Sequence, residues 1–138
     1  MEWYHDSYVV SDDRKFLDLN TIYKLLKPTY WANGRSKETI EQSIENSFSF
    51  GVYENNKQIG FARVVSDQAV FSWILDVVID PEYQGRGIGS FLMKSILEHP
   101  LLKNTKFALA TKDAHRFYET FNFIERPCMV RRMVKDEQ

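Results

Sequence analysis

The sequence has 138 residues, a length that predicts one domain built around one hydrophobic core. Hydrophobic residues make up 43% and charged residues 27%, a balance typical of globular proteins that excludes an intrinsically disordered chain. The formal net charge of −1 gives no electrostatic reason to expect nucleic acid or an anionic membrane as a partner.

The cysteine count and the apolar segments bear on the cellular compartment. Cys128 is the only cysteine, so no disulfide can form within the chain, which fits a reducing environment. The first residues lack the basic and apolar regions of a secretory signal. The longest apolar stretch, around Val77–Ile79, is too short to span a bilayer. We therefore expect a cytoplasmic protein without a membrane partner.

The first third of the sequence predicts one strand and two helices. Tyr8–Val10 is typical of a short strand. Apolar residues at helical spacing predict a helix over Asp18–Lys27, which Pro28 ends. Ser36 is a favourable N-cap for a second helix that continues to about Ser47.

The middle of the sequence predicts an antiparallel meander. Phe48–Tyr53 and Gln58–Ser66 alternate like strands, and Asn55-Asn56 between them tolerates the positive φ angles of a tight hairpin. The alternation places four side chains on one side of the second strand: Ile59, Phe61, Arg63 and Val65. Asp67-Gln68 then turns the chain into a third strand, Val70–Ile79.

After Pro81 the sequence predicts a glycine-rich loop, a helix over Gly87–Glu98 and a strand over Phe107–Thr111. Asp113 is expected to cap a short helix on which Ala114, Phe117 and Phe121 share a face. A final strand, Met129–Val134, is expected to close the chain. This order of elements predicts a mixed α+β (α/β) protein rather than a Rossmann sheet.

The glycine-rich loop carries the strongest chemical signal. Gly85, Gly87 and Gly89 lie at alternate positions between an apolar strand and an amphipathic helix. Unshielded backbone amides at a helix N-terminus form a cradle for phosphate or pyrophosphate, although a tight turn without a ligand would have the same glycines. The loop lacks the Lys-Ser/Thr pair of a Walker A motif and the spacing of a dinucleotide-binding motif.

Two segments together resemble the GCN5-related N-acetyltransferase (GNAT) family. Gln84-x-x-Gly87-x-Gly89, preceded by a strand and Asp80-Pro81-Glu82-Tyr83, is similar to motif A of that family. The segment from Ala114 to Phe123 is similar to motif B, written A-x-x-x-Y-x-x-x-G-F. The resemblance covers most of the chain. It implies an acyl-CoA N-acyltransferase fold, with a central, mostly antiparallel twisted sheet flanked by helices, and acetyl-CoA as cosubstrate.

The resemblance also implies which residues bind the cosubstrate. The strand before the loop splays from its neighbour, so that backbone groups of Val77, Val78 and Ile79 pair with the pantetheine arm. The loop holds the pyrophosphate, a role that falls to Gln84, Gly85, Arg86, Gly87, Ile88, Gly89 and Ser90. Thr111 stands where many members have a pantetheine-binding Asn.

Tyr118 matches the family's general acid, which protonates the departing thiolate, although a packed aromatic residue is the alternative. Asp76 is an acidic residue on an otherwise apolar strand, where burial would be costly without a reason. It is a candidate to orient or deprotonate the substrate amine, directly or through water. A structural salt bridge to Arg63 or Arg35 is equally compatible with the sequence.

Residues 29–36 are expected to contact the substrate, with Trp31 and Arg35 as a pocket wall, although Tyr30 and Trp31 could instead cap the core. Asn122 replaces the usual Gly of motif B and should still allow a left-handed helix end. The histidines are widely spaced, so we expect no metal site.

These features predict direct transfer of an acetyl group from acetyl-CoA to a primary amine of a small molecule or peptide. Two other hypotheses remain: a non-catalytic acyl-CoA sensor, and an interaction domain whose loop binds an unrelated anion. The sequence is compatible with a homodimer, but no residue argues for or against one.

Overall fold

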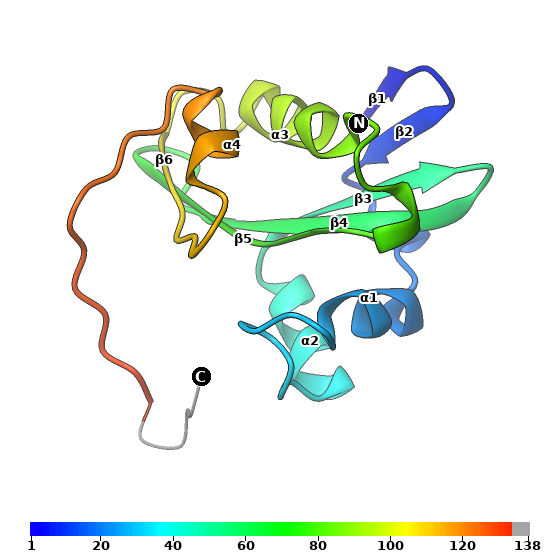
Figure 1. The fold of residues 1–138 in the computed structure, drawn as a ribbon, viewed down its shortest axis with the longest axis horizontal. Coiled ribbons are helices and arrows are strands. Elements are labelled where there is room, and N and C mark those ends of the chain that lie inside the picture. The colour runs from blue at the N-terminus through cyan, green and yellow to red at the C-terminus, as the bar shows by residue number, and fades with distance from the viewer. Residues whose placement is uncertain (134–138) are drawn as a thin grey trace.

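The computed structural model describes residues 1–133 and shows a curved sheet with helices on both faces (Figure 1). The strands follow one another across the sheet in the order in which they occur in the sequence. They are β1 (Glu2–His5), β2 (Tyr8–Ser11), β3 (Phe48–Glu54), β4 (Lys57–Ser66), β5 (Phe71–Ile79) and β6 (Lys106–Ala108). All neighbours are antiparallel except β5 and β6, which are parallel. The expected mixed fold is confirmed.

Two pairs of helices cover the two faces of the sheet (Figure 1). One face packs against α3 (Ile88–Glu98) and α4 (His115–Glu119), and the other against α1 (Leu19–Leu26) and α2 (Lys37–Glu45). The core on the α3 face is formed by Phe50, Ile59, Val64, Ile88, Leu92 and Ile96, among others. The core on the α1 face is smaller and is formed by Phe61, Ile22, Leu26 and Ile40, among others. No helix in residues 1–133 has the length and apolar character needed to cross a membrane.

Local signals in the sequence predict the helix starts and one turn correctly. The Asp18 carboxylate accepts hydrogen bonds from the amides of Asn20 and Thr21, and Ser36 accepts one from the Thr39 amide. Asn55 and Asn56 have φ angles of 50° and 65° and form the tight turn between β3 and β4. The second helix ends at Glu45, slightly before the expected boundary.

A β-bulge corrects the expected face of Ile59. Val52 pairs with Gly60 and Tyr53 with Gln58, so Ile59 has no partner across β3. The extra residue reverses the alternation, because successive side chains of a strand point to opposite faces. Ile59 therefore packs in the α3 core, whereas Phe61 packs in the α1 core. The prediction that these two side chains share a side of the strand is wrong.

The ends of the described chain also differ from expectation. β1 was not predicted, because its residues are mostly exposed and show no apolar alternation. The predicted last strand, Met129–Val134, is absent as far as the structure describes it. Residues 124–133 contain no strand and run away from the sheet (Figure 1). Val134 lies outside the described residues. No strand lies beside this segment within residues 1–133, so its alternation has nothing to pair with.

The predicted cap of the last helix is wrong as well. The Thr111 hydroxyl, not Asp113, accepts the hydrogen bond from the Ala114 amide at 3.0 Å, and α4 begins at His115. Phe121 lies beyond the end of the helix. Asn122 has a φ angle of 69°, as expected for a left-handed residue after a helix.

The bulge can be tested by comparing Ile59→Ala with Val65→Ala. Ile59 is fully buried, so its truncation should lower the free energy of unfolding by about 2–5 kcal/mol. Val65 is 45% exposed, so its truncation should cost about 1 kcal/mol or less. Urea denaturation measures both. Equal losses would contradict the bulge, because an uninterrupted strand would place both side chains on the same face.

Candidate active site

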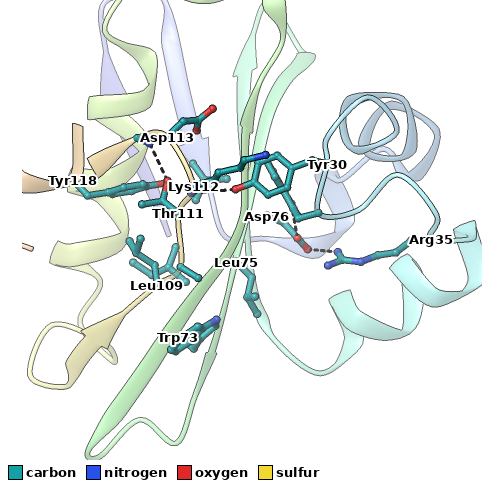
Figure 2. A pocket seen from close by; sticks show the side chains of 15 residues that line it. Tyr30, Arg35, Trp73, Leu75, Asp76, Leu109, Thr111, Lys112, Asp113 and Tyr118 are labelled. Carbon is teal, nitrogen blue, oxygen red and sulfur yellow. Dashed lines mark hydrogen bonds and ion pairs between the residues drawn. The ribbon is translucent and has the colours of Figure 1, made fainter. Parts of the chain in front are cut away.

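The site lies where β5 and β6 part. The two strands pair only over three positions, the last of which joins Trp73 to Ala108. Beyond it, Leu109–Thr111 diverges from Ile74–Val77, and a cavity of about 450 Å³ opens between them. The start of α4 and the loop after α1 complete its walls (Figure 2). The divergence implied by the family resemblance is therefore present.

Asp76 lies at a second bulge, with a positive φ angle of 57°. Phe61 pairs with Val78 and Arg63 with Leu75, so two residues of β5, Asp76 and Val77, lie opposite one residue of β4. Left-handed backbone is uncommon in a strand interior, and Asp and Asn are among the few residues other than Gly that adopt it. It persists here together with a set of contacts to the Asp76 carboxylate.

The Asp76 side chain is 1% exposed, and its carboxylate accepts three hydrogen bonds. Arg63 Nε and Arg35 Nη1 donate to Oδ2 at 2.6 and 2.7 Å, and Trp31 Nε1 donates to Oδ1 at 3.1 Å. Both salt bridges considered from the sequence are therefore present. The carboxylate holds the loop that carries Trp31 and Arg35 against the sheet (Figure 2).

Tyr118 projects from α4 into the cavity (Figure 2). Its ring packs against Phe117 and Phe123, with ring centroids 5.0 and 5.9 Å away. Its hydroxyl has no hydrogen-bond partner within residues 1–133. Burial, with a smaller contribution from nearby Tyr30, raises the pKa of Tyr118 above the ordinary value for a phenol. The side chain is both a packed aromatic residue and a protonated donor open to the cavity.

Two wall residues, Trp73 and Lys112, were not singled out from the sequence, and a third, Tyr30, was considered only as a cap of the core. The hydroxyl of Tyr30 accepts a hydrogen bond from the Lys112 amide at 3.2 Å, and the Lys112 ammonium lies 5.3 Å from the Tyr30 ring centroid. This contact joins the substrate loop to the segment after β6. Trp73 lines the cavity from β5. Its two-residue spacing from Leu75 could have indicated that these two side chains face the same side, whereas the bulge at Asp76 turns Val77 to the face of Ile74.

The glycine-rich loop follows β5 and leads into α3. Gly85 and Gly87 both have φ angles of 78°, and a Cβ atom at either position would meet nothing within 4 Å. Glycine is needed there for the backbone conformation, not for lack of space. In the described part of the chain, the amides from Gly85 to Ser90 donate no hydrogen bond, and Gly87 gives α3 no side-chain cap. Free amides at a helix start are of the kind that can bind an anion.

The predicted site residues fall into two groups. The cavity brings six of them together: Trp31, Arg35, Asp76, Val77, Thr111 and Tyr118. The loop residues Gln84–Ser90 do not line it, but Gly89 lies against Phe117 on α4, one residue before Tyr118.

Several loop-side residues make contacts within the protein. Val78 packs toward the α1 core, and Ile88 is buried in the α3 core. The side chains of Gln84 and Arg86 donate to the carbonyls of Ile79 and Glu82, each at 3.2 Å. Within residues 1–133 no cluster of three or more His, Cys, Asp or Glu side chains could hold a metal ion.

Replacement of Asp76 by Asn tests the charge at the bulge. Asn tolerates the left-handed backbone and keeps an acceptor for Trp31, but it leaves two partly buried arginines without their anion. The free energy of unfolding should fall by about 3 kcal/mol or more in urea denaturation. Asp113→Asn is the matched control, since Asp113 is exposed, and should change it by about 0.5 kcal/mol or less. A loss for Asp76→Asn no larger than the control's would contradict this role.

Comparison with known proteins gives the family. The model of the acetyltransferase (GNAT) family matches residues 16–123. An uncharacterized N-acetyltransferase, ycf52, of Gracilaria tenuistipitata is 34% identical over 125 residues, which cover 86% of this chain and 68% of the relative. A ycf52-like N-acetyltransferase of Prochlorococcus marinus is 33% identical over 99 residues, which cover 67% of this chain and 54% of the relative. The chain thus spans about half to two thirds of these relatives.

A solved structure from Xanthomonas campestris, described as belonging to the GNAT family, is 35% identical with a TM-score of 0.87. The match covers 91% of this chain and 93% of that one. A second solved structure, a protein from Staphylococcus aureus, is 23% identical with a TM-score of 0.75 and supports the fold alone. Sequence, fold and cavity agree, and this chain belongs to the GNAT family of acetyltransferase enzymes.

Proposed function

We propose that the chain transfers the acetyl group of acetyl-CoA to a primary amine by direct attack, without a covalent enzyme intermediate. Acetyl-CoA supplies an acetyl group activated as a thioester. The observation that carries the proposal is the cavity between β5 and β6, which the unpartnered hydroxyl of Tyr118 faces. Cys128 lies on the exposed C-terminal segment rather than in this cavity, which is consistent with transfer that uses no thiol of the protein.

The residues present fit a pantetheine chain and a pyrophosphate. Within residues 1–133, β5 has no strand beside it beyond Trp73 on the β6 side. Backbone groups of Val77–Ile79, apart from the Ile79 carbonyl that accepts from Gln84, are therefore available to an extended ligand. The amides of Gly85–Ser90 then bind the pyrophosphate at the start of α3. Thr111 lines the cavity opposite β5 and contacts the pantetheine in this arrangement.

In the reaction, Tyr118 donates its proton to the sulfur as the thiolate leaves. A phenol suits this role because it carries no charge beside the sulfur before the transfer. Its raised pKa keeps it protonated at neutral pH. A backbone N–H on the free edge of β5 stabilises the negative charge that develops on the acyl oxygen.

The amine binds on the other side of the cavity, where Trp31 and Arg35 form the wall. Asp76 orients this wall and reaches the amine through a water molecule, because its oxygens already accept three hydrogen bonds. Asp113 is the exposed carboxylate in the cavity lining and attracts a cationic amine. The amine must lose its proton before it attacks, either to solvent or through water.

Tyr118→Phe tests the acid. The variant keeps the packed ring but removes the proton donor, so kcat should fall by about 100-fold or more while the Kd of acetyl-CoA stays unchanged. Thiol release with a polyamine, an aminoglycoside and a peptide with a free amino terminus measures kcat. Calorimetric titration measures Kd.

Phe121→Leu is the control, since Phe121 contacts Phe117 but does not line the 450 Å³ cavity. Acetyl-CoA that binds no more tightly than pyrophosphate would refute the cosubstrate assignment. Tight binding of acetyl-CoA without turnover on the three amines would indicate an acyl-CoA sensor instead, provided that Tyr118→Phe binds acetyl-CoA as the wild-type chain does.

The pH dependence follows from the same residue. The folded-state pKa of Tyr118 is raised, so its acid form persists to and beyond the ordinary value of about 10 and is lost only at higher pH. With a primary amine, kcat/KM should rise with pH as the neutral amine accumulates. It should show no decline at any pH under about 10. A descending limb centred near pH 8 that disappears in Tyr118→Phe would contradict the raised pKa of Tyr118.

A further inference from the structure

Two arginines share one carboxylate beside the cavity between β5 and β6. Arg63 and Arg35 both donate to Oδ2 of Asp76. Within residues 1–133, neither guanidinium forms a salt bridge with any other acidic side chain. The cluster therefore retains one positive charge, although the side chains of Arg35, Arg63 and Asp76 are only 22%, 12% and 1% exposed. A charge that is largely removed from water is costly without a counter-ion.

Arg35 is the member of this cluster that a ligand can reach. It lines the cavity, whereas Arg63 does not. Among the described residues, only Nη1 of the Arg35 side chain donates a hydrogen bond, so the N–H groups of Nε and Nη2 remain for another acceptor. These two nitrogens lie on the same edge of the guanidinium, and such an edge binds a carboxylate through two parallel hydrogen bonds.

Three aromatic side chains line the same cavity as Arg35. Tyr30 and Trp31 lie edge to face, with ring centroids 5.1 Å apart, and Trp73 contributes from β5. Aromatic walls of this kind favour a ligand with a flat or apolar body.

The cavity has its acidic end on the side opposite Arg35. Asp113 and Tyr118 lie there, at and before the start of the α4 wall (Figure 2). Asp113 is exposed and attracts an ammonium group. Lys112 is the other cation in the lining, and its exposed ammonium lies over the Tyr30 ring, 5.3 Å from the centroid. A ligand with an amine at one end and a carboxylate at the other therefore matches the charges of both ends.

We propose that the acceptor is a small amine that also bears a carboxylate, and that Arg35 binds this carboxylate. The inference rests on the proposed acetyl transfer, whose acceptor it specifies. The one positive charge left in the arginine cluster matches the single charge of a carboxylate better than the nearly double charge of a phosphate. The body of the acceptor lies against the aromatic wall, and its amine faces Asp113 and Tyr118.

The reaction then proceeds on the bound acceptor as follows from its chemistry. The amine nitrogen forms a bond to the acyl carbon, and the bond between that carbon and sulfur breaks. The thiolate takes the proton of Tyr118, which regains one from water, and the new amide nitrogen loses one proton to water. The carboxylate takes no part in these steps, so it contributes to binding and orientation alone.

Matched pairs of substrates test the carboxylate. Each pair consists of an acid and its neutral amide: para-aminomethylbenzoate with para-aminomethylbenzamide, and phenylalanine with phenylalaninamide. Thiol release should give a kcat/KM that is about tenfold or more higher for the acid in at least one pair. para-Aminomethylphenylphosphonate should be a poorer substrate than the better acid. No preference for the acid in either pair, or a phosphonate that reacts faster than both acids, would overturn the proposal.

Arg35→Gln tests which group binds the carboxylate. The variant removes the cation, so the ratio of kcat/KM for the acid to that for the amide should fall by about tenfold or more. This ratio cancels any change in activity that the two substrates share. Arg116→Gln is the matched control, since Arg116 is exposed on α4 and does not line the cavity, and it should keep the wild-type ratio. A ratio that falls in Lys112→Gln but not in Arg35→Gln would contradict the assignment to Arg35.

A binding measurement separates this proposal from the proposed acetyl transfer. para-Toluate and para-toluamide have no amine and cannot react, so NMR titration of the wild-type chain, with and without CoA, requires neither turnover nor a stable variant. The Kd of para-toluate should be about tenfold lower than that of para-toluamide. Preferential binding of para-toluate without turnover of any amine would refute the acetyl transfer and leave the carboxylate site. Turnover of amines without a preference for acids, together with equal binding of the two toluyl compounds, would refute the carboxylate site and leave the acetyl transfer.

Discussion

The buried carboxylate of Asp76 joins the two sides of the active site. A carboxylate that is 1% exposed needs compensating partners, and two arginines and an indole N–H supply them. Arg63 belongs to the neighbouring strand β4, whereas Trp31 and Arg35 belong to the loop between α1 and α2. The bulge in β5 turns the Asp76 side chain toward that loop. One acidic residue thereby fixes the position of the loop between α1 and α2 relative to the sheet.

The divergence of β5 and β6 depends on contacts at both ends of the cavity. At one end the strands pair over three positions; at the other, the Lys112 amide donates to the Tyr30 hydroxyl across the opening. The Thr111 hydroxyl accepts a hydrogen bond from the Ala114 amide just before α4, and α4 carries Tyr118 into the cavity. The gap between the strands is thus bounded by specific hydrogen bonds, and its backbone groups remain available to a ligand.

Features that depend on neighbouring residues could be predicted from the sequence. Asp18 and Ser36 cap their helices, Asn55-Asn56 forms the hairpin turn, and Asn122 ends α4 in the left-handed region, because each effect is local. The two motifs indicated the family, the glycine-rich loop and the helix that carries Tyr118. The bulge at Ile59 could not be predicted, since an extra residue leaves no mark on an alternating pattern. Tyr30, Trp73 and Lys112 meet only through the fold, and the final segment has no strand partner within the described chain.

The left-handed backbone at Asp76 also limits how this position can vary. Glycine fits the backbone but removes the anion, and β-branched residues are excluded by the φ angle of 57°. Glutamate keeps the charge but moves it by one methylene, away from three donors that are already at hydrogen-bond distance. Asparagine alone retains the shape, without the charge. In a saturation library, position 76 should therefore tolerate fewer substitutions than almost any other in the sheet, whereas Tyr30, Trp73 and Asp113 around the same cavity carry no such backbone constraint.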